Sequence, residues 1–245
     1  MTVEVFADPR AVTSAAVEAV VEAASRAIDA AGRFTVALSG GSTPRAVFQQ
    51  LAAPGYADRI EWEAVHVFWG DERCVPPSDP SSNYAMAKEM LLDHVGVKPG
   101  HIHRILGEDD PEAAAGAYER LLRRSFSTPQ GPPGHHTGSR FDLVLLGMGE
   151  DGHTASLFPG TAAVTETQRW VMPVESPVPP RRRVSLTPPV INAAGEKLFL
   201  VTGEAKAPAL AGVLSGPKDP QTLPAQVVED ARWLVDEAAA SMRER

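Results

Sequence analysis

The sequence predicts an α/β protein in which helices cover both faces of a mostly parallel sheet. Three observations support this fold class. Short apolar segments alternate along the chain with segments whose apolar residues follow helical spacing. Several helical segments begin with Asp-Pro or Thr-Pro, which is typical of an N-cap followed by proline at the first helical position. The run FDLVLL, residues 141–146, is almost entirely apolar, as expected for a parallel strand buried on both faces.

The first half of the chain contains two helix starts of this kind. Asp8 and Pro9 predict a helix whose apolar positions continue to Ile28, and Gly32 stands where a C-cap glycine belongs. Thr43 and the proline after it predict a second capped helix. The elements expected after the first helix are a strand at 34–38, a helix from about 44 to 51, a strand at 65–69 and a helix at 83–94.

The second half continues the alternation. Asp110 is expected to cap a helix that runs to residue 122, and the Pro-, Gly- and His-rich segment 127–139, with His135 and His136, is predicted to be a mobile loop. We see no internal repeat and no clean linker, so residues 1–245 are expected to form a single domain. The strands expected here are 141–146, 170–174, 184–186 and 197–201, with a last strand and helix near 233–242.

Composition limits the classes of function. Of the 245 residues, 43% are hydrophobic and 22% charged, which is typical of a globular protein. A formal net charge of −8 disfavours broad nucleic-acid binding. No apolar run is long enough to span a bilayer, and no signal segment is evident at the N-terminus. Because Cys74 is the single cysteine, we expect a cytoplasmic location.

Three strands are followed by loops of distinct chemical character, at the sheet edge where α/β proteins bind ligands. The first loop is Ser39-Gly40-Gly41-Ser42. Its glycines allow close approach of the backbone, and the following helix start offers free N–H groups, so the loop suits a phosphate. A purely structural strand-to-helix turn fits this local sequence equally well. The spacing is not that of a Walker loop.

The second loop, residues 70–73, places three charged residues directly after the strand VHVFW. Arg73 is suited to grip a phosphate in a forked geometry that lysine cannot match. The alternative is a solvated charged turn.

The third loop, Gly147 to Thr154, carries the strongest signal. His153 is suited to take a proton from water and return it to a leaving oxygen, and Asp151 lies where it can orient the imidazole. The backbone N–H groups of the turn are candidate oxyanion donors. Residues 147–152 also spell G-x-G-x-x-G, the dinucleotide fingerprint, with Glu175 at a suitable distance. However, Pro159 and its neighbours interrupt the helix that this fingerprint requires.

Two further clusters favour ordinary structural roles. His101 and His103 have strand spacing on one face, but no third ligand is evident, so no metal site is expected. Residues 181–183 are three consecutive arginines after a Pro-rich segment. They are interpreted as a solvated strand entrance, with contact to a phosphate as the alternative.

Taken together, these loops resemble the 6-phosphogluconolactonases and, more distantly, the glucosamine-6-phosphate deaminases. The segments that carry the resemblance are VALSGGSTPRAVFQQLA, VHVFWGDERCVPPSDPSSNYAMAKEMLL, FDLVLLGMGEDGHTASLFPG and RRRVSLTPPVINAAGEKLFLVTGEAKAPAL. The resemblance implies a Rossmann-like three-layer α/β/α fold and cofactor-independent, metal-independent hydrolysis of 6-phospho-D-glucono-1,5-lactone, a step of the oxidative pentose phosphate pathway. It assigns the water-activating role to His153, beside Asp151, and substrate contacts to the SGGSTP loop, Arg73 and Lys206.

The deaminases differ from this chain at two places. They carry Asp-Glu-Tyr where residues 71–73 read Asp-Glu-Arg, and Phe-Asn-Glu-Pro where residues 156–159 read Ser-Leu-Phe-Pro. The second acidic residue needed for isomerisation is therefore missing, whereas ester hydrolysis needs only one base and a water. A sugar-phosphate deaminase or isomerase and a non-catalytic sugar-phosphate sensor remain the alternatives. The expected state is a monomer or a weak homo-oligomer with a phosphorylated sugar lactone as its ligand.

Overall fold

A computed structural model describes residues 1–126 and 141–242, and its centre is a six-stranded parallel sheet of order β1-β9-β8-β5-β2-β3. A smaller antiparallel sheet has the order β4-β7-β6. The loop expected at 127–139 lies outside the described residues. The strands are β1 Thr2–Phe6, β2 Phe34–Leu38, β3 Val65–Trp69, β4 Asp71–Arg73, β5 Leu143–Gly147, β6 Val171–Glu175, β7 Arg182–Leu186, β8 Glu196–Val201 and β9 Arg232–Asp236.

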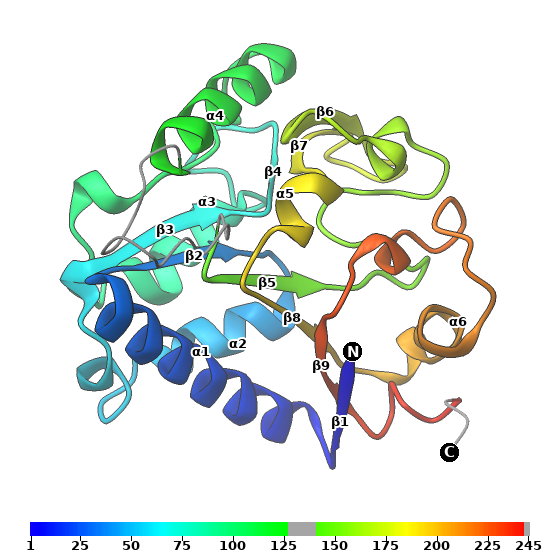
Figure 1. Cartoon of the computed structure of the whole chain (residues 1–245), viewed down its shortest axis with the longest axis horizontal. Helices are drawn as coiled ribbons and strands as arrows, with labels where there is room; N and C mark the ends of the chain where they lie inside the picture. The colour runs from blue at the N-terminus through cyan, green and yellow to red at the C-terminus, as the bar shows by residue number, and fades with distance from the viewer. Residues whose placement is uncertain (127–140, 243–245) are drawn as a thin grey trace.

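The helices form layers on either side of the six-stranded sheet. Figure 1 shows α1 (Pro9–Ala31) and α2 (Ser42–Leu51) on one face, with α4 (Pro111–Phe126), α5 (Pro188–Asn192) and the small sheet on the other. The short helix α3 (Asn83–Ala87) and helix α6 (Ala207–Ser215) complete the set of α-helices in the described residues. This confirms the predicted three-layer α/β fold with a mostly parallel central sheet.

Two of the three predicted N-caps are present, and one is wrong. The Asp8 carboxylate accepts a hydrogen bond from the Ala11 N–H at 2.8 Å, and Gly32 closes α1 in the left-handed conformation. The Asp110 carboxylate likewise accepts from N–H groups at the start of α4. In contrast, α2 starts two residues earlier than expected, and no side chain caps it. Thr43 lies inside the first turn, where its hydroxyl bonds to that of Thr202 at 2.9 Å.

The structure corrects the sequence prediction at four other places. The helix expected at 83–94 is a short α-helix followed by a π-helical turn over Lys88–Leu92. Residues 237–242 form turns rather than a final helix, because an isolated segment this short has little helical stability of its own. Strand β1 was not anticipated. Finally, the charged segment 71–73 is strand β4, paired with β7 more than 100 residues later in the chain.

The core is thickest around the middle strands of the large sheet. All five residues of β2 are buried, as are the first four of β5 and the last five of β8. On the β8–β9 side, the rings of Phe199 and Trp233 stack with centroids 3.7 Å apart. Because the middle strands are fixed on both faces, the loops at their carboxyl ends start from rigid positions.

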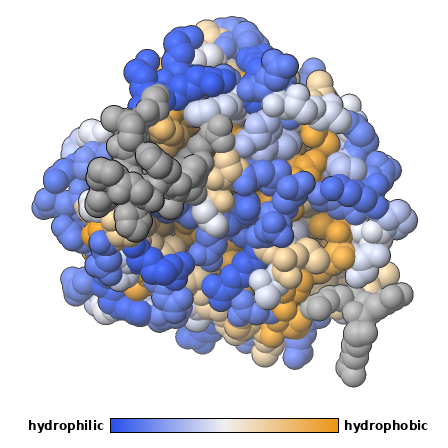
Figure 2. Space-filling model, viewed as in Figure 1, coloured by the Kyte–Doolittle hydropathy of each residue, from blue (hydrophilic) through white to orange (hydrophobic). Residues whose placement is uncertain are grey.

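The surface is mainly hydrophilic on the face shown in Figure 2, with apolar patches between the polar side chains. The exposed large apolar side chains include Val5 of the edge strand β1, which is 47% exposed. Among the described residues, none of the helices combines the length and apolar character needed to cross a membrane.

A cluster of three histidines lies at the opposite end of β3 from the charged loop. His66 stacks on His101 with ring centroids 3.8 Å apart, and its Nδ1 lies 3.2 Å from Nε2 of His103. His66 therefore joins His101 and His103 in one cluster, which the spacing of the latter two along the chain does not indicate. Among the described residues, no group of three or more His, Cys, Asp or Glu side chains is placed to hold a metal ion.

This cluster predicts a loss of stability in mild acid. Burial, followed by the charges of His101, His103 and Arg33, lowers the pKa of His66 to about 4, against 6.5 for an ordinary histidine. Between these two values the unfolded chain binds a proton that the native protein does not, so stability falls as the pH falls from about 6.5 to about 4. We expect the difference in melting temperature between pH 7.5 and pH 5 to be smaller for His66→Phe than for the wild type. An equal difference in both proteins would show that His66 does not contribute.

Candidate active site

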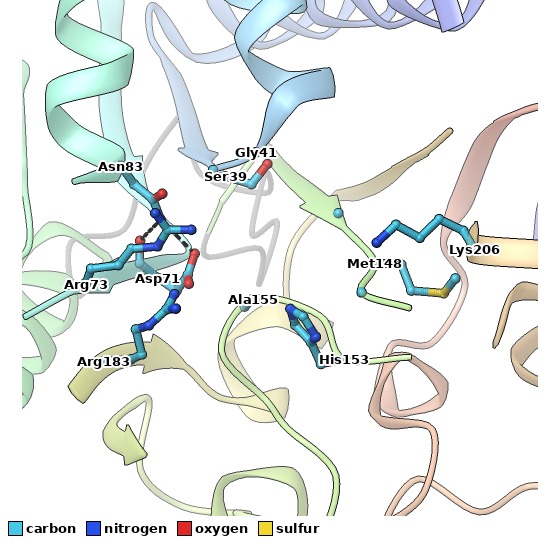
Figure 3. Close-up of a pocket in the computed structure, with 13 residues that line it drawn as sticks. Ser39, Gly41, Asp71, Arg73, Asn83, Met148, His153, Ala155, Arg183 and Lys206 are labelled. Atoms are coloured by element: carbon cyan, nitrogen blue, oxygen red, sulfur yellow. Dashed lines mark hydrogen bonds between the residues drawn. The ribbon is translucent and has the colours of Figure 1, made fainter. Parts of the chain in front are cut away.

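The carboxyl ends of the parallel strands surround one cavity, to which the small sheet also contributes (Figure 3). Its residues come from the loops after β2, β5 and β8, from β4 and β7, and from the start of α3. The three loops singled out in the sequence therefore meet at one place. The thirteen lining residues are Ser39, Gly40, Gly41, Asp71, Arg73, Asn83, Gly147, Met148, Gly149, His153, Ala155, Arg183 and Lys206.

His153 and Asp151 form a hydrogen-bonded pair at the edge of this cavity. Nδ1 of His153 lies 2.5 Å from the Asp151 carboxylate, and the His153 backbone N–H donates to the same oxygen at 3.1 Å. Burial raises the pKa of Asp151, but the hydrogen bond and charge of His153 outweigh it and hold that pKa below its ordinary value. A carboxylate at Nδ1 favours the tautomer in which Nε2 carries no proton. Nε2 is then available to accept a proton from water.

The glycine-rich turn before His153 has the tight geometry that its sequence suggested. Gly152 has a φ of 76°, a conformation that glycine adopts without strain. A Cβ atom on Gly149 would lie 2.1 Å from Nδ1 of His153, so only glycine leaves room for the imidazole. The N–H of Gly149 donates to the His153 carbonyl and that of Gly152 to the Gly149 carbonyl. These two amides are therefore already engaged within the turn.

The structure supports the rejection of a dinucleotide-binding site at this turn. In the described structure, residues 148–161 form turns, and no helix starts within the glycine motif. Glu175, the proposed ribose ligand, ends β6 in the small sheet. The geometry therefore lacks the helix N-terminus that would face a pyrophosphate.

The Ser39–Ser42 loop follows β2 and contributes three of its four residues to the cavity. Ser39 is 6% exposed, and its hydroxyl has no hydrogen-bond partner among the described residues. Gly41 has a φ of 105°, which side-chain-bearing residues rarely adopt, and it precedes the first turn of α2. Ser42, by contrast, is exposed and does not line the cavity. An unpaired hydroxyl and a helix start facing the cavity suit an anionic or hydroxylated ligand.

Asp71 and Asn83 are hydrogen-bonded to each other on one side of the cavity. The Asp71 carboxylate accepts from Nδ2 of Asn83 at 3.1 Å and from the Ser156 hydroxyl at 2.6 Å. A Cβ atom on Gly40 would lie 2.0 Å from Oδ1 of Asn83, so this glycine is required for close approach. The sequence pattern predicts only that a helix starts at Asn83. The sequence feature that could have indicated a role at the site is its amide side chain at a helix start, ten residues after the charged segment that ends at Arg73.

Glu72 does not line the cavity but fixes the start of α3 by hydrogen bonds. Its carboxylate accepts from the N–H groups of Arg73, Asn83 and Tyr84 and from the hydroxyl of Ser82. Burial raises the pKa of Glu72, and these hydrogen bonds partly offset that shift. The residue holds α3 against β4 rather than facing the cavity.

Three cationic side chains reach the cavity from two sides. Figure 3 shows Arg73 and Arg183 entering beside Asp71, and Lys206 entering from the opposite side, with His153 between them. Lys206 directly precedes α6. Arg183 corrects our interpretation of the arginine cluster. It is only 6% exposed, whereas the side chains of residues 181 and 182 are exposed.

Comparison with known proteins identifies the family. Residues 7–235 match the model for glucosamine-6-phosphate isomerases/6-phosphogluconolactonase. The chain belongs to this family. It is 38% identical to a 6-phosphogluconolactonase from Nostoc sp. over 98% of this chain and 97% of the relative, and 39% identical to one from Mycobacterium tuberculosis with the same coverage.

A solved structure supports the same family. The 6-phosphogluconolactonase from Trypanosoma cruzi superposes with a TM-score of 0.83 and 29% identity, covering 98% of this chain and 96% of that one. The family match includes all thirteen residues that line the cavity. The cavity is therefore part of the structure that this chain shares with the glucosamine-6-phosphate isomerase/6-phosphogluconolactonase family.

Proposed function

We propose that this protein hydrolyses 6-phospho-D-glucono-1,5-lactone to 6-phospho-D-gluconate, as a step of the oxidative pentose phosphate pathway. The observation that carries this proposal is the His153–Asp151 pair at the edge of a cavity that also contains three cationic side chains. The pair supplies a base for activating water, and the cations suit a phosphorylated substrate. The names of the relatives, which match nearly the whole chain, support the same reaction.

In the proposed mechanism, Nε2 of His153 accepts a proton from water as the water oxygen attacks the C1 carbonyl of the lactone. Asp151, bonded to Nδ1, keeps the ring in position and stabilises the imidazolium that forms. The bond between C1 and the ring oxygen then breaks, and His153 returns the proton to the departing oxygen. No residue needs to form a covalent bond with the substrate.

We propose that the phosphate lies against the Ser39–Ser42 loop and the start of α2, with Arg73 and Lys206 supplying charge. Nη1 of Arg73 donates to the Ser81 carbonyl at 2.5 Å, which fixes the guanidinium at the cavity edge. Its Nε is buried and has no hydrogen-bond partner among the described residues. Lys206 reaches in from the other side, so the substrate is held between opposite walls.

The residues around the cavity favour hydrolysis over the deaminase or isomerase alternative. Asp71 is the acidic residue among those lining the cavity, and both its oxygens already accept hydrogen bonds. Leu157 and Phe158, which occupy the positions of Asn-Glu in the deaminases, are both apolar and buried. The cavity thus offers one free base, which is sufficient for ester hydrolysis. We further propose that the protein acts in the cytoplasm, as a single-domain monomer or weak homo-oligomer.

Proton release provides the test of this function. We expect the wild-type protein to accelerate acid formation from 6-phospho-D-glucono-1,5-lactone well above the spontaneous rate, measured with a pH indicator in weak buffer. Ammonia release from glucosamine 6-phosphate, measured in parallel, should stay at background. Folded protein that leaves the lactone at its spontaneous rate but releases ammonia would assign the deaminase reaction instead. Binding of both compounds without turnover would point to a sensor.

A further inference from the structure

We infer that Arg183 binds the phosphate group of the substrate together with Arg73. This inference deepens the proposed function, on which it rests for the identity of the anion. It assigns a ligand-binding role to a residue that its sequence, three arginines after a Pro-rich segment, did not distinguish from its neighbours.

The first observation is the pairing of the two arginines. Arg73 of β4 and Arg183 of β7 are direct partners in the antiparallel register, so their side chains project from the same face of the small sheet. Both line the cavity, and Figure 3 shows them side by side next to Asp71. Like charges directly opposite one another are destabilising in a sheet. A bound anion would offset the repulsion between these two guanidinium groups.

The second observation is that the protein itself supplies too little negative charge. Arg183 is 6% exposed, and its Nε donates to the Pro180 carbonyl at 2.6 Å. Within residues 1–126 and 141–242, neither Arg73 nor Arg183 has a carboxylate oxygen within 4.0 Å of its nitrogens. The Asp71 carboxylate already accepts hydrogen bonds from Asn83 and Ser156, and the Glu72 carboxylate accepts from the N–H groups at the start of α3.

Burial and the neighbouring charge of Arg73 both lower the pKa of Arg183, which reflects the cost of keeping this second cation in place. A guanidinium nevertheless remains charged at neutral pH. Two positive charges that share one engaged carboxylate leave an excess that a phosphate dianion can neutralise. Sugar hydroxyls cannot do so, and the lactone carries no carboxylate before it is hydrolysed. The phosphate is thus the substrate group that matches the pair.

The test compares Arg183→Met with Arg182→Met, its exposed neighbour on the same strand. Each variant is assayed with 6-phospho-D-glucono-1,5-lactone and with D-glucono-1,5-lactone, which lacks the phosphate. Loss of a charged hydrogen bond is expected to lower kcat/KM for the phosphorylated lactone by about 10- to 100-fold in Arg183→Met. The effect on the unphosphorylated lactone should be no more than about threefold. Equal kcat/KM values for the two variants on the phosphorylated lactone would overturn the inference.

A binding measurement separates this inference from folding defects and from the proposed reaction. Inorganic phosphate should raise the melting temperature of the wild type and of Arg182→Met, because it binds only the native protein. Arg183→Met should lose most of this rise, and Arg183→Lys should recover part of it. If the wild type fails to hydrolyse the lactone, the proposed function fails, yet the phosphate-dependent rise still tests Arg183. If folded Arg183→Met shows the same phosphate-dependent rise in melting temperature as the wild type, the inference is contradicted, whichever reaction the protein catalyses.

Discussion

Replacing His153 by alanine is expected to lower kcat for lactone hydrolysis by about 10²- to 10⁴-fold, which is the usual contribution of a positioned general base. The expectation follows from the pair with Asp151, which leaves Nε2 of the imidazole available at the cavity edge. Binding should be little changed, because the cations and the Ser39–Ser42 loop remain. The measurement is the initial rate of proton release at saturating lactone, together with the dissociation constant of the product acid.

His94→Ala is the matched control for this variant. His94 is exposed, and its imidazole bonds only to the Glu89 carbonyl among the described residues, so replacing this side chain should leave kcat near the wild-type value. If His153→Ala instead weakens product binding and keeps kcat, His153 is a ligand contact and the base must be sought elsewhere. Near-normal activity in both variants would remove His153 from the mechanism.

Replacing Gly149 by alanine is also expected to lower kcat strongly, although the glycine itself takes no part in the chemistry. The new methyl group would lie 2.1 Å from Nδ1 of His153 and 2.5 Å from the Asp151 carboxylate. The backbone cannot readily retreat, because the Gly149 N–H donates to the His153 carbonyl at 2.8 Å. The imidazole must therefore move or lose its bond to Asp151. A displacement of about 1 Å at a catalytic group costs on the order of 10²-fold in rate.

Gly100→Ala is the control for the glycine substitution, since a Cβ atom there would meet nothing within 4 Å. Both variants should melt close to the wild type, and only Gly149→Ala should lose kcat. A crystal structure of Gly149→Ala should show the His153 ring displaced from the Asp151 carboxylate. Unchanged kcat with an unmoved ring would mean that the turn adapts more easily than its hydrogen bonds indicate.

Local sequence was sufficient for the features that depend on nearby residues. Asp8 and Gly32 mark the ends of α1 because capping involves atoms only a few residues apart. The buried strands β2 and β5 were evident from continuous apolar runs, since only a buried strand tolerates them. Both Gly41 and Thr43 can precede a helix, and here the pattern predicted the wrong one as the cap of α2.

Local sequence does not predict the small sheet, because strands β4 and β7 pair across a large separation in the chain. Nothing near residues 71–73 indicates that they pair with β7, so they were interpreted as a loop. The same pairing buries Arg183 and turns it toward the cavity, while Arg181 and Arg182 remain exposed to solvent. Asn83 likewise reaches the cavity only because Glu72 and Asp71 hold the start of α3 against β4.

By itself, the sequence determined the fold class, the capped helices, the buried strands and the three loops that carry polar or catalytic residue types. These features follow from spacing, capping and apolar runs, which are local properties of the chain. Only the tertiary structure decided which of these side chains meet: the Nδ1 contact of His153 with Asp151, the occupied oxygens of Asp71 and the buried pair of Arg73 and Arg183. The contact of Asp71 with Ser156 spans 85 residues and the pairing of Arg73 with Arg183 spans 110, so both depend on strand register and tertiary packing, which no local pattern encodes.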